Sequence, residues 1–177
     1  MRLVAFDLDD TLAPSKSALP SAMAQQLRAL LDVVPVCVIS GGEFGQFRAQ
    51  LLENLDATSE QLSKLHLMPT CGTRYYRWNA DHSNWDQVYA NDLSQDERER
   101  AIKSLRLRAH EQGVWEAQPW GEIIEDRGSQ ITFSALGQQA PLEAKRAWDP
   151  SGDKKRKLRD AVALDVPDLE VRAGGST

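Results

Sequence analysis

Short apolar runs alternate with stretches of helical spacing along the first half of the chain. The run at 33–39 is continuous and rich in β-branched residues, which is typical of a strand buried in a parallel sheet. Apolar positions at 21–31 follow helical spacing behind a serine, and a similar stretch covers 43–55. With apolar runs at 2–8 and 66–69, the pattern predicts β-α-β-α-β, an open parallel sheet with helices on its faces.

The pattern changes near residue 80. We predict a hairpin from 74–78 and 85–89, then a capped helix over 94–113. The remaining apolar segments are short, and we read them as strands at 115–118, 122–126, 130–136 and 169–172, with a charged helix at 150–162. The predicted fold class is α/β: a Rossmann-like core of parallel strands over 1–80 and an α+β domain with an antiparallel sheet over 81–177.

Composition narrows the class of protein. The chain has 177 residues, 41% hydrophobic and 27% charged, with a net charge of −5. This balance fits a globular protein and argues against a general nucleic-acid binder, which would be basic. No apolar run approaches a membrane span, and the N-terminus lacks a signal-peptide pattern. Cys37 and Cys71 are predicted to be free thiols, which together with these features predicts a cytoplasmic protein.

Three carboxylates follow the first apolar run, in Asp7-Leu8-Asp9-Asp10-Thr11. Like charges this close repel unless a cation or hydrogen-bond donors compensate them. A carboxylate can attack phosphorus, a second can transfer protons, and Mg²⁺ can screen the phosphoryl charge. The motif therefore predicts a phosphoryl-transfer site, although a strand end with Asp10 or Thr11 capping the next helix is the alternative.

Phosphate ligands are predicted at the ends of the first two strands. The backbone amide of Leu8 lies at the end of the first predicted strand, and Ser40 and Gly41 follow the second. Carboxyl ends of adjacent parallel strands share one edge of a sheet, so Asp7, Asp9 and Ser40 should lie together there. Backbone N–H groups at a helix start bind phosphate, although Ser-Gly-Gly is also an ordinary turn.

These two motifs resemble the haloacid dehalogenase superfamily, whose first motif is Asp-x-Asp-x-Thr and whose second is a Ser or Thr after the next strand. The resemblance implies a Mg²⁺ cofactor, with Asp7 as nucleophile and metal ligand. It implies Asp9 as general acid/base, with its backbone carbonyl on the metal, and Ser40 as phosphate anchor.

The second half resembles the substrate cap of eukaryotic-type phosphomannomutases and related sugar-phosphate phosphatases, a class IIB-type α/β cap. The resemblance lies in Glu125–Thr132, Leu136-Gly137, Glu143–Lys145 and Ala173–Thr177. It implies that Lys16, Arg127 and Lys145 hold the substrate's distal phosphate. Gln138 stands where that family has another Arg, which weakens the case for a mutase. The alternatives are surface lysines at 16 and 145 and an ion pair between Arg127 and its acidic neighbours.

Two motifs of the superfamily are missing: a lysine that neutralises the aspartyl-phosphate and a downstream acidic pair that completes the Mg²⁺ site. We expect the chain to be an N-terminal fragment truncated before the core is complete. Strand 2–8 should then be an exposed edge of the sheet, able to pair with another chain. Weak Mg²⁺ binding and little turnover are also expected.

Three functions remain open at this point. The first is a Mg²⁺-dependent phosphatase of a small phosphorylated metabolite, with a sugar phosphate favoured. The second is a phosphomannomutase-type sugar phosphomutase, and the third is an inactive phosphate-binding module. A small phosphorylated substrate is the expected partner, with no nucleic acid or membrane, and self-association through the cap or through strand 2–8 stays open.

Overall fold

The computed structural model describes residues 3–174, and the chain divides into two compact units between Asp92 and Leu93. The fold class is α/β, as predicted. The division lies beyond the expected boundary at residue 80, because the hairpin that follows residue 73 pairs with the sheet of the first unit.

The first unit contains a five-stranded sheet whose order follows the sequence, β1-β2-β3-β4-β5. Strands β1, β2 and β3 are parallel, which confirms the predicted β-α-β-α-β core, and β4 and β5 are antiparallel additions. The strands are β1 (Val4–Asp7), β2 (Val36–Ile39), β3 (Leu65–Met68), β4 (Arg74–Asn79) and β5 (Asn84–Ala90). The helices are α1 (Ser21–Val33), α2 (Phe44–Phe47), η1 (Arg48–Leu52), α3 (Glu53–Leu55), α4 (Ser59–Ser63) and η2 (Thr70–Gly72).

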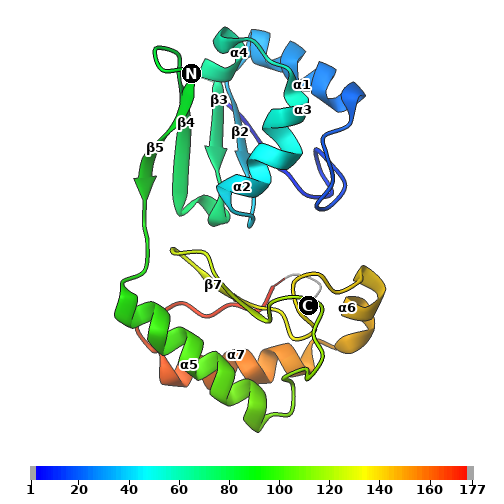
Figure 1. The fold of residues 1–177 in the computed structure, drawn as a ribbon, viewed down its shortest axis with the longest axis vertical. Helices are drawn as coiled ribbons and strands as arrows, with labels where there is room; N and C mark the ends of the chain where they lie inside the picture. The colour runs from blue at the N-terminus through cyan, green and yellow to red at the C-terminus, as the bar shows by residue number, and fades with distance from the viewer. Residues whose placement is uncertain (1–2, 175–177) are drawn as a thin grey trace. The chain divides into compact units, whose positions relative to one another are not determined.

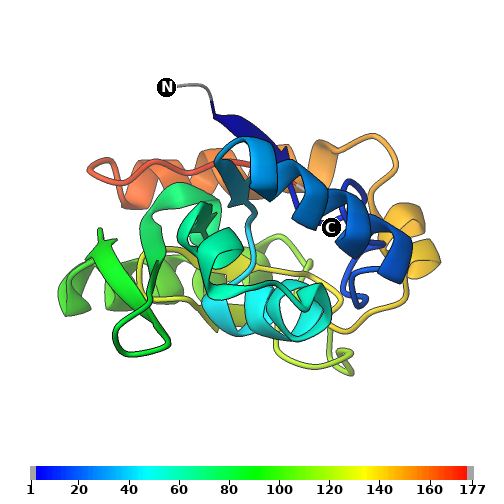
Figure 2. The ribbon, with the colours of Figure 1, turned by 90° about the horizontal axis from the view of Figure 1, so that it is seen from above.

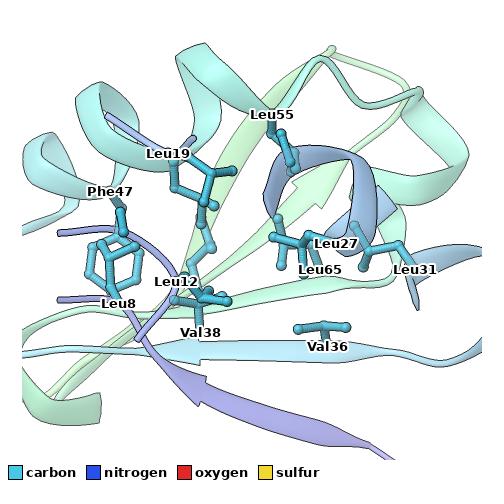
Figure 3. Packing of buried hydrophobic residues seen from close by; sticks show 14 residues of the cluster. Leu8, Leu12, Leu19, Leu27, Leu31, Val36, Val38, Phe47, Leu55 and Leu65 are labelled. Atoms are coloured by element: carbon cyan, nitrogen blue, oxygen red, sulfur yellow. The ribbon is translucent and has the colours of Figure 1, made fainter. Parts of the chain in front are cut away.

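The layer of helices α1 to α4 lies on one face of this sheet (Figures 1 and 2). The expectation of helices on both faces is therefore wrong for the described part of the first unit. The buried cluster between the layers includes Leu8, Leu31, Val38, Phe47 and Leu67, all fully buried. Figure 3 shows Leu8, Leu12 and Phe47 at the end of this cluster near the carboxyl end of β1. The core thus reaches directly beneath the carboxylate motif.

Strand β1 is an edge strand, as the sequence predicts. It pairs with β2 through the register Val4–Val36 to Asp7–Ile39, and no other described strand pairs with it. Half of its residues are exposed, including Ala5 and Asp7. The outer backbone groups of an unprotected edge are available for pairing with another strand.

The second unit packs two long helices and a small antiparallel hairpin. Its elements are α5 (Gln95–Glu111), β6 (Ile124–Asp126), β7 (Ile131–Phe133), α6 (Leu142–Trp148) and α7 (Asp153–Asp165). The predicted strands at 115–118 and 169–172 are wrong, because neither segment has a strand partner among residues 3–174. Trp115 and Leu169 instead pack against the buried cluster that contains residues of α5 and α7.

Helix α5 begins at the predicted serine cap. The Ser94 Oγ accepts from the Glu97 backbone N–H at 3.3 Å, and the Glu97 carboxylate accepts from the Ser94 N–H at 2.6 Å. This reciprocal pair satisfies two donors that a helix start otherwise leaves unpaired. Across residues 3–174, no helix is both long enough and apolar enough to span a membrane.

Two aspartates near the end of α7 and just after it bind arginines of α5. Asp165 accepts from Arg108 at 2.6 and 2.8 Å and from the Ser104 hydroxyl at 2.7 Å. Asp168 accepts from Arg100 at 2.6 and 2.9 Å. These hydrogen bonds favour the charged carboxylates and lower the pKa of Asp165, and likewise that of Asp168, from 3.8 to about 2.

The second unit should therefore lose stability in acid. A carboxyl whose pKa is lower in the folded state stabilises that state above its unfolded pKa and loses this contribution as pH falls from about 4 to about 2. We expect faster amide hydrogen exchange in α5 and α7 over that range, and Asp165→Asn should reduce the dependence. Asp160→Asn, which alters only an exposed pair with Arg159, is the control. An unchanged acid response in D165N would contradict the assignment.

Candidate active site

The candidate site lies at the carboxyl ends of β1 and β2. Asp7 is the last residue of β1 and pairs in register with Ile39, the last residue of β2, so Asp7 and Ser40 lie at the same edge of the sheet, as predicted. The Asp7 side chain is exposed, whereas Ser40 is only 6% exposed. An exposed carboxylate beside a buried hydroxyl can meet an anionic ligand from solvent.

The loop after β1 folds back on itself and positions the second aspartate. The Leu8 carbonyl accepts from the amides of Leu12 and Ala13 at 3.0 and 3.1 Å, and the Asp10 amide donates to the Ala13 carbonyl at 2.7 Å. Leu8, Leu12 and Ala13 are buried in the core. Asp10 has φ of 57°, a conformation that Asp and Asn adopt more readily than most residues. These anchors leave Asp9 half-buried beside helix α2.

The Asp9 carboxylate is held by three N–H donors of the described residues. Its Oδ1 accepts from the Lys16 backbone amide at 3.0 Å and from Gln50 Nε2 at 3.2 Å. Its Oδ2 accepts from Gln46 Nε2 at 2.9 Å. These donors supply the compensation that the clustered carboxylates were expected to need.

The two glutamines did not emerge from the sequence analysis. They stand four residues apart, beside the apolar positions Phe47, Leu51 and Leu55, which the core buries. Gln50 is 4% exposed and lies in the π-helical segment η1. The sequence does contain a sign of their role: two glutamines at helical spacing stand at the border of the apolar face. A glutamine that is buried there must find hydrogen-bond partners for its amide.

The predicted phosphate ligands lie around the same edge. The Leu8 amide donates to Asp7 Oδ1 at 2.8 Å, so in this structure it orients the carboxylate. Gly41 follows Ser40, and the Ser40 carbonyl accepts from the Cys71 amide at 2.9 Å, which ties the β2 loop to η2. A β-carbon on Gly41 would lie 3.7 Å from Cys71 Sγ, an ordinary contact, so packing alone does not require glycine there.

Both cysteines are free thiols, as predicted. Cys37 is buried in β2, and its burial raises the pKa of its thiol, which keeps the sulfur protonated. A buried neutral thiol behaves as a small apolar side chain. Cys37 therefore belongs to the sheet packing and not to the chemistry of the strand ends.

Residues that could hold a metal are few. Among residues 3–174, no group of three or more His, Cys, Asp or Glu side chains has the arrangement of a metal site. The Asp7 carboxylate is exposed at the strand end, whereas both oxygens of Asp9 accept hydrogen bonds. Mg²⁺ needs only one or two protein carboxylates, because water and substrate phosphate complete its shell, so Asp7 and the Asp9 carbonyl fit such an ion.

The cations predicted to hold a distal phosphate lie in both units. Lys16 is exposed in the loop after β1, with φ of 55°. Arg127 pairs with Glu125 at 2.7 Å, which agrees with the ion-pair alternative, and Lys145 Nζ donates to the Gln138 carbonyl at 3.2 Å.

Arg127 and Lys145 are connected within the second unit by a short series of contacts. Gln138 Nε2 donates to the Thr132 hydroxyl at 3.4 Å, and Thr132 lies opposite Glu125 in the β6–β7 hairpin. The structure therefore brings together the two predicted cap cations and the glutamine that replaces the family's arginine.

Comparison with known proteins gives one curated relative of the chain. Phosphomannomutase of Schizosaccharomyces pombe is 24% identical over 164 residues, which cover 93% of this chain and 61% of the relative. No family model matches the chain. The chain thus spans less than two thirds of the length of the curated relative that it matches.

Solved structures share the fold at low sequence identity. An N-terminally truncated, IMP-bound IMP-nucleotidase of Plasmodium falciparum has a TM-score of 0.60 and 11% identity, over 97% of this chain and 48% of the other. The C-terminal domain of a Candida albicans trehalose synthase regulatory protein has a TM-score of 0.53 and 13% identity, over 96% of this chain and 53% of the other.

These findings agree with the resemblance predicted from the sequence: the chain is similar to phosphomannomutase and shares its α/β fold with the solved structures. Its first strand ends at Asp7, the first residue of the Asp-x-Asp-x-Thr motif on which that resemblance rests.

Proposed function

We propose that the protein is a Mg²⁺-dependent phosphoryl-transfer enzyme that acts on a small phosphorylated metabolite, with a sugar phosphate as the favoured substrate, in the cytoplasm. The observation that carries this proposal is the end of β1, where Asp7 is exposed beside Ser40 while the neighbouring Asp9 is held by amide donors. One carboxylate is therefore available for attack, and the other is fixed for proton transfer.

The proposed reaction has two steps. An Asp7 carboxylate oxygen attacks the phosphorus, the bond from phosphorus to the leaving oxygen breaks, and Asp9 gives that oxygen a proton. Water then attacks the phosphorus of the aspartyl-phosphate, its proton passes to Asp9, and the bond to Asp7 breaks. Inorganic phosphate is released, and both carboxylates return to their starting states.

Several residues of this chain would bind the phosphoryl group. Ser40 and the Gly41 amide lie at the same strand edge as Asp7 and would hold its oxygens. A bound Mg²⁺, held by Asp7 and the Asp9 carbonyl, would neutralise phosphoryl charge. Lys16, Arg127 and Lys145 would contact the rest of the substrate, with the first unit as the catalytic core and the second unit as the specificity domain.

Turnover by the purified chain should be slow and its Mg²⁺ affinity weak, because the described residues contain no group of three or more His, Cys, Asp or Glu side chains arranged to hold a metal ion. We expect no saturable heat signal when Mg²⁺ is titrated in calorimetry, and release of inorganic phosphate from glucose 6-phosphate only on long incubation. Chelation of the metal should remove that release. Rapid Mg²⁺-dependent hydrolysis would show that the site is already complete.

A sugar phosphomutase is the second candidate, favoured by the similarity to phosphomannomutase. A mutase would convert mannose 1-phosphate in a reaction that depends on an added hexose bisphosphate, whereas a phosphatase would release inorganic phosphate. Gln138, in place of a cationic side chain, makes the phosphatase the first choice. An inactive phosphate-binding module would bind phosphate, but it would not release inorganic phosphate from a substrate and would not become phosphorylated.

A further inference from the structure

Gln50 is the most buried polar residue that contacts the candidate site. Besides Asp9, its Nε2 donates to the Ser17 carbonyl at 2.9 Å, and its Oε1 accepts from Gln46 Nε2 at 2.6 Å. Its backbone carbonyl accepts from the Leu19 amide at 2.7 Å. One side chain thus links the Asp9 carboxylate, the loop that carries Lys16 and the helix beneath them.

The donors are distributed unequally over the Asp9 carboxylate. Oδ1 accepts two hydrogen bonds, from Lys16 and Gln50, whereas Oδ2 accepts one, from Gln46. A carboxylate has about four lone-pair sites, two on each oxygen. The described donors therefore leave one of these sites open, and it lies on Oδ2.

We propose that Gln46 and Gln50 are positioning residues that fix the Asp9 carboxylate and direct its proton transfer to Oδ2. This inference rests on the proposed function of Asp9 as general acid/base. A general base must be held within hydrogen-bond reach of the proton that it moves, and loss of that alignment lowers the rate more than it lowers substrate binding.

The π-helical segment and Gly42 belong to the same arrangement. Short π-helical stretches occur often at functional sites, and this one contains Gln50. A β-carbon on Gly42 would overlap the Gln46 amide. Because that amide is the far end of a flexible side chain, Gly42→Ala should displace Gln46 from Asp9 without unfolding the core.

The first test measures amide hydrogen exchange in the full chain, independently of any activity. Gln50→Met and Gln46→Met keep the side-chain length and remove the donors, so exchange of the Lys16 amide should accelerate about tenfold. Gly42→Ala should act like Gln46→Met. Gln61→Met is the matched control, because Gln61 also donates to a carboxylate, Asp32 at 2.9 Å, but belongs to α4. Unchanged Lys16 exchange in both Q50M and Q46M would overturn the proposal.

The second test measures hydrolysis of glucose 6-phosphate with Mg²⁺. Q50M should lower kcat about 10- to 100-fold, which is less than the roughly 10²- to 10⁴-fold attributed to general acid–base catalysis as a whole because Asp9 itself remains, and leave KM within about twofold. Gln50→Glu, which brings a carboxylate next to Asp9, should lower kcat further. Unchanged kcat in Q50M and Q46M would overturn the positioning role. If the wild-type chain neither releases phosphate nor becomes phosphorylated, the proposed function fails, and the exchange data alone decide whether the glutamines hold Asp9.

Discussion

Asp7→Asn is expected to abolish covalent phosphorylation of the chain and to lower its phosphate release by roughly 10⁴-fold or more, the scale on which loss of a nucleophile acts. The fold should be unaffected, because asparagine retains an Oδ1 that can accept the Leu8 amide, as Asp7 Oδ1 does at 2.8 Å. The side chain is also exposed, so the change leaves no cavity.

The measurement uses a sugar phosphate with a radiolabelled phosphoryl group. After an acid quench, the wild-type chain should retain label that hydroxylamine removes, as expected for an acyl phosphate, and D7N should retain none. Asp10→Asn is the control: Asp10 is exposed, accepts only the Ser15 amide among the described donors, at 3.0 Å, and has a conformation that asparagine tolerates. Label or release that survives in D7N would exclude Asp7 as the nucleophile.

Phe47→Ala should lower the free energy of unfolding of the first unit by about 3–5 kcal/mol, the usual cost of removing a buried phenyl group. Phe47 is fully buried in the cluster that contains Leu8 and Leu12. A loss of this size is a large fraction of the stability of an ordinary domain. The effect should extend to the site, because Phe47 follows Gln46 and packs beneath the carboxylate loop.

Urea unfolding that is monitored by amide hydrogen exchange distinguishes the stability of the first unit from that of the second. Amides of β2 and β3 should lose protection in F47A, while those of α5 and α7 should keep theirs. Val33→Ala is the control, since Val33 is 83% exposed at the end of α1 and should change stability by less than about 0.5 kcal/mol. A cost below about 1 kcal/mol for F47A would contradict the packing described for the core.

Periodicity and strand-end chemistry were sufficient to predict the parallel core. The run at 33–39 and the helix at 21–31 each have one dominant pattern, so β1, α1 and β2 were found in the expected order. Asp7 and Ser40 could be placed side by side at the carboxyl ends of their strands, because neighbouring parallel strands end on the same side of a sheet.

Features that depend on tertiary packing could not be predicted in the same way. Residues 169–172 alternate like a strand but find no strand partner, and α6 is too short for its periodicity to be distinctive. The predicted core, 1–80, included only the first strand of the hairpin that follows residue 73. The sequence does not show which sheet a hairpin joins. Gln46 and Gln50 belong to no motif, since amide donors become meaningful only when the loop after β1 brings Asp9 to them.

The sequential order of the sheet has a consequence for how the protein folds. Strands β4 and β5 are joined by the turn at 80–83, so their pairing closes a short loop, whereas β1 pairs with β2 across α1, and β2 pairs with β3 across the segment that contains α2 to α4. Closing a longer loop costs more entropy, and distant pairings slow folding. We infer that the β4–β5 hairpin pairs before the parallel strands, so the strand that carries Asp7 becomes ordered after the hairpin.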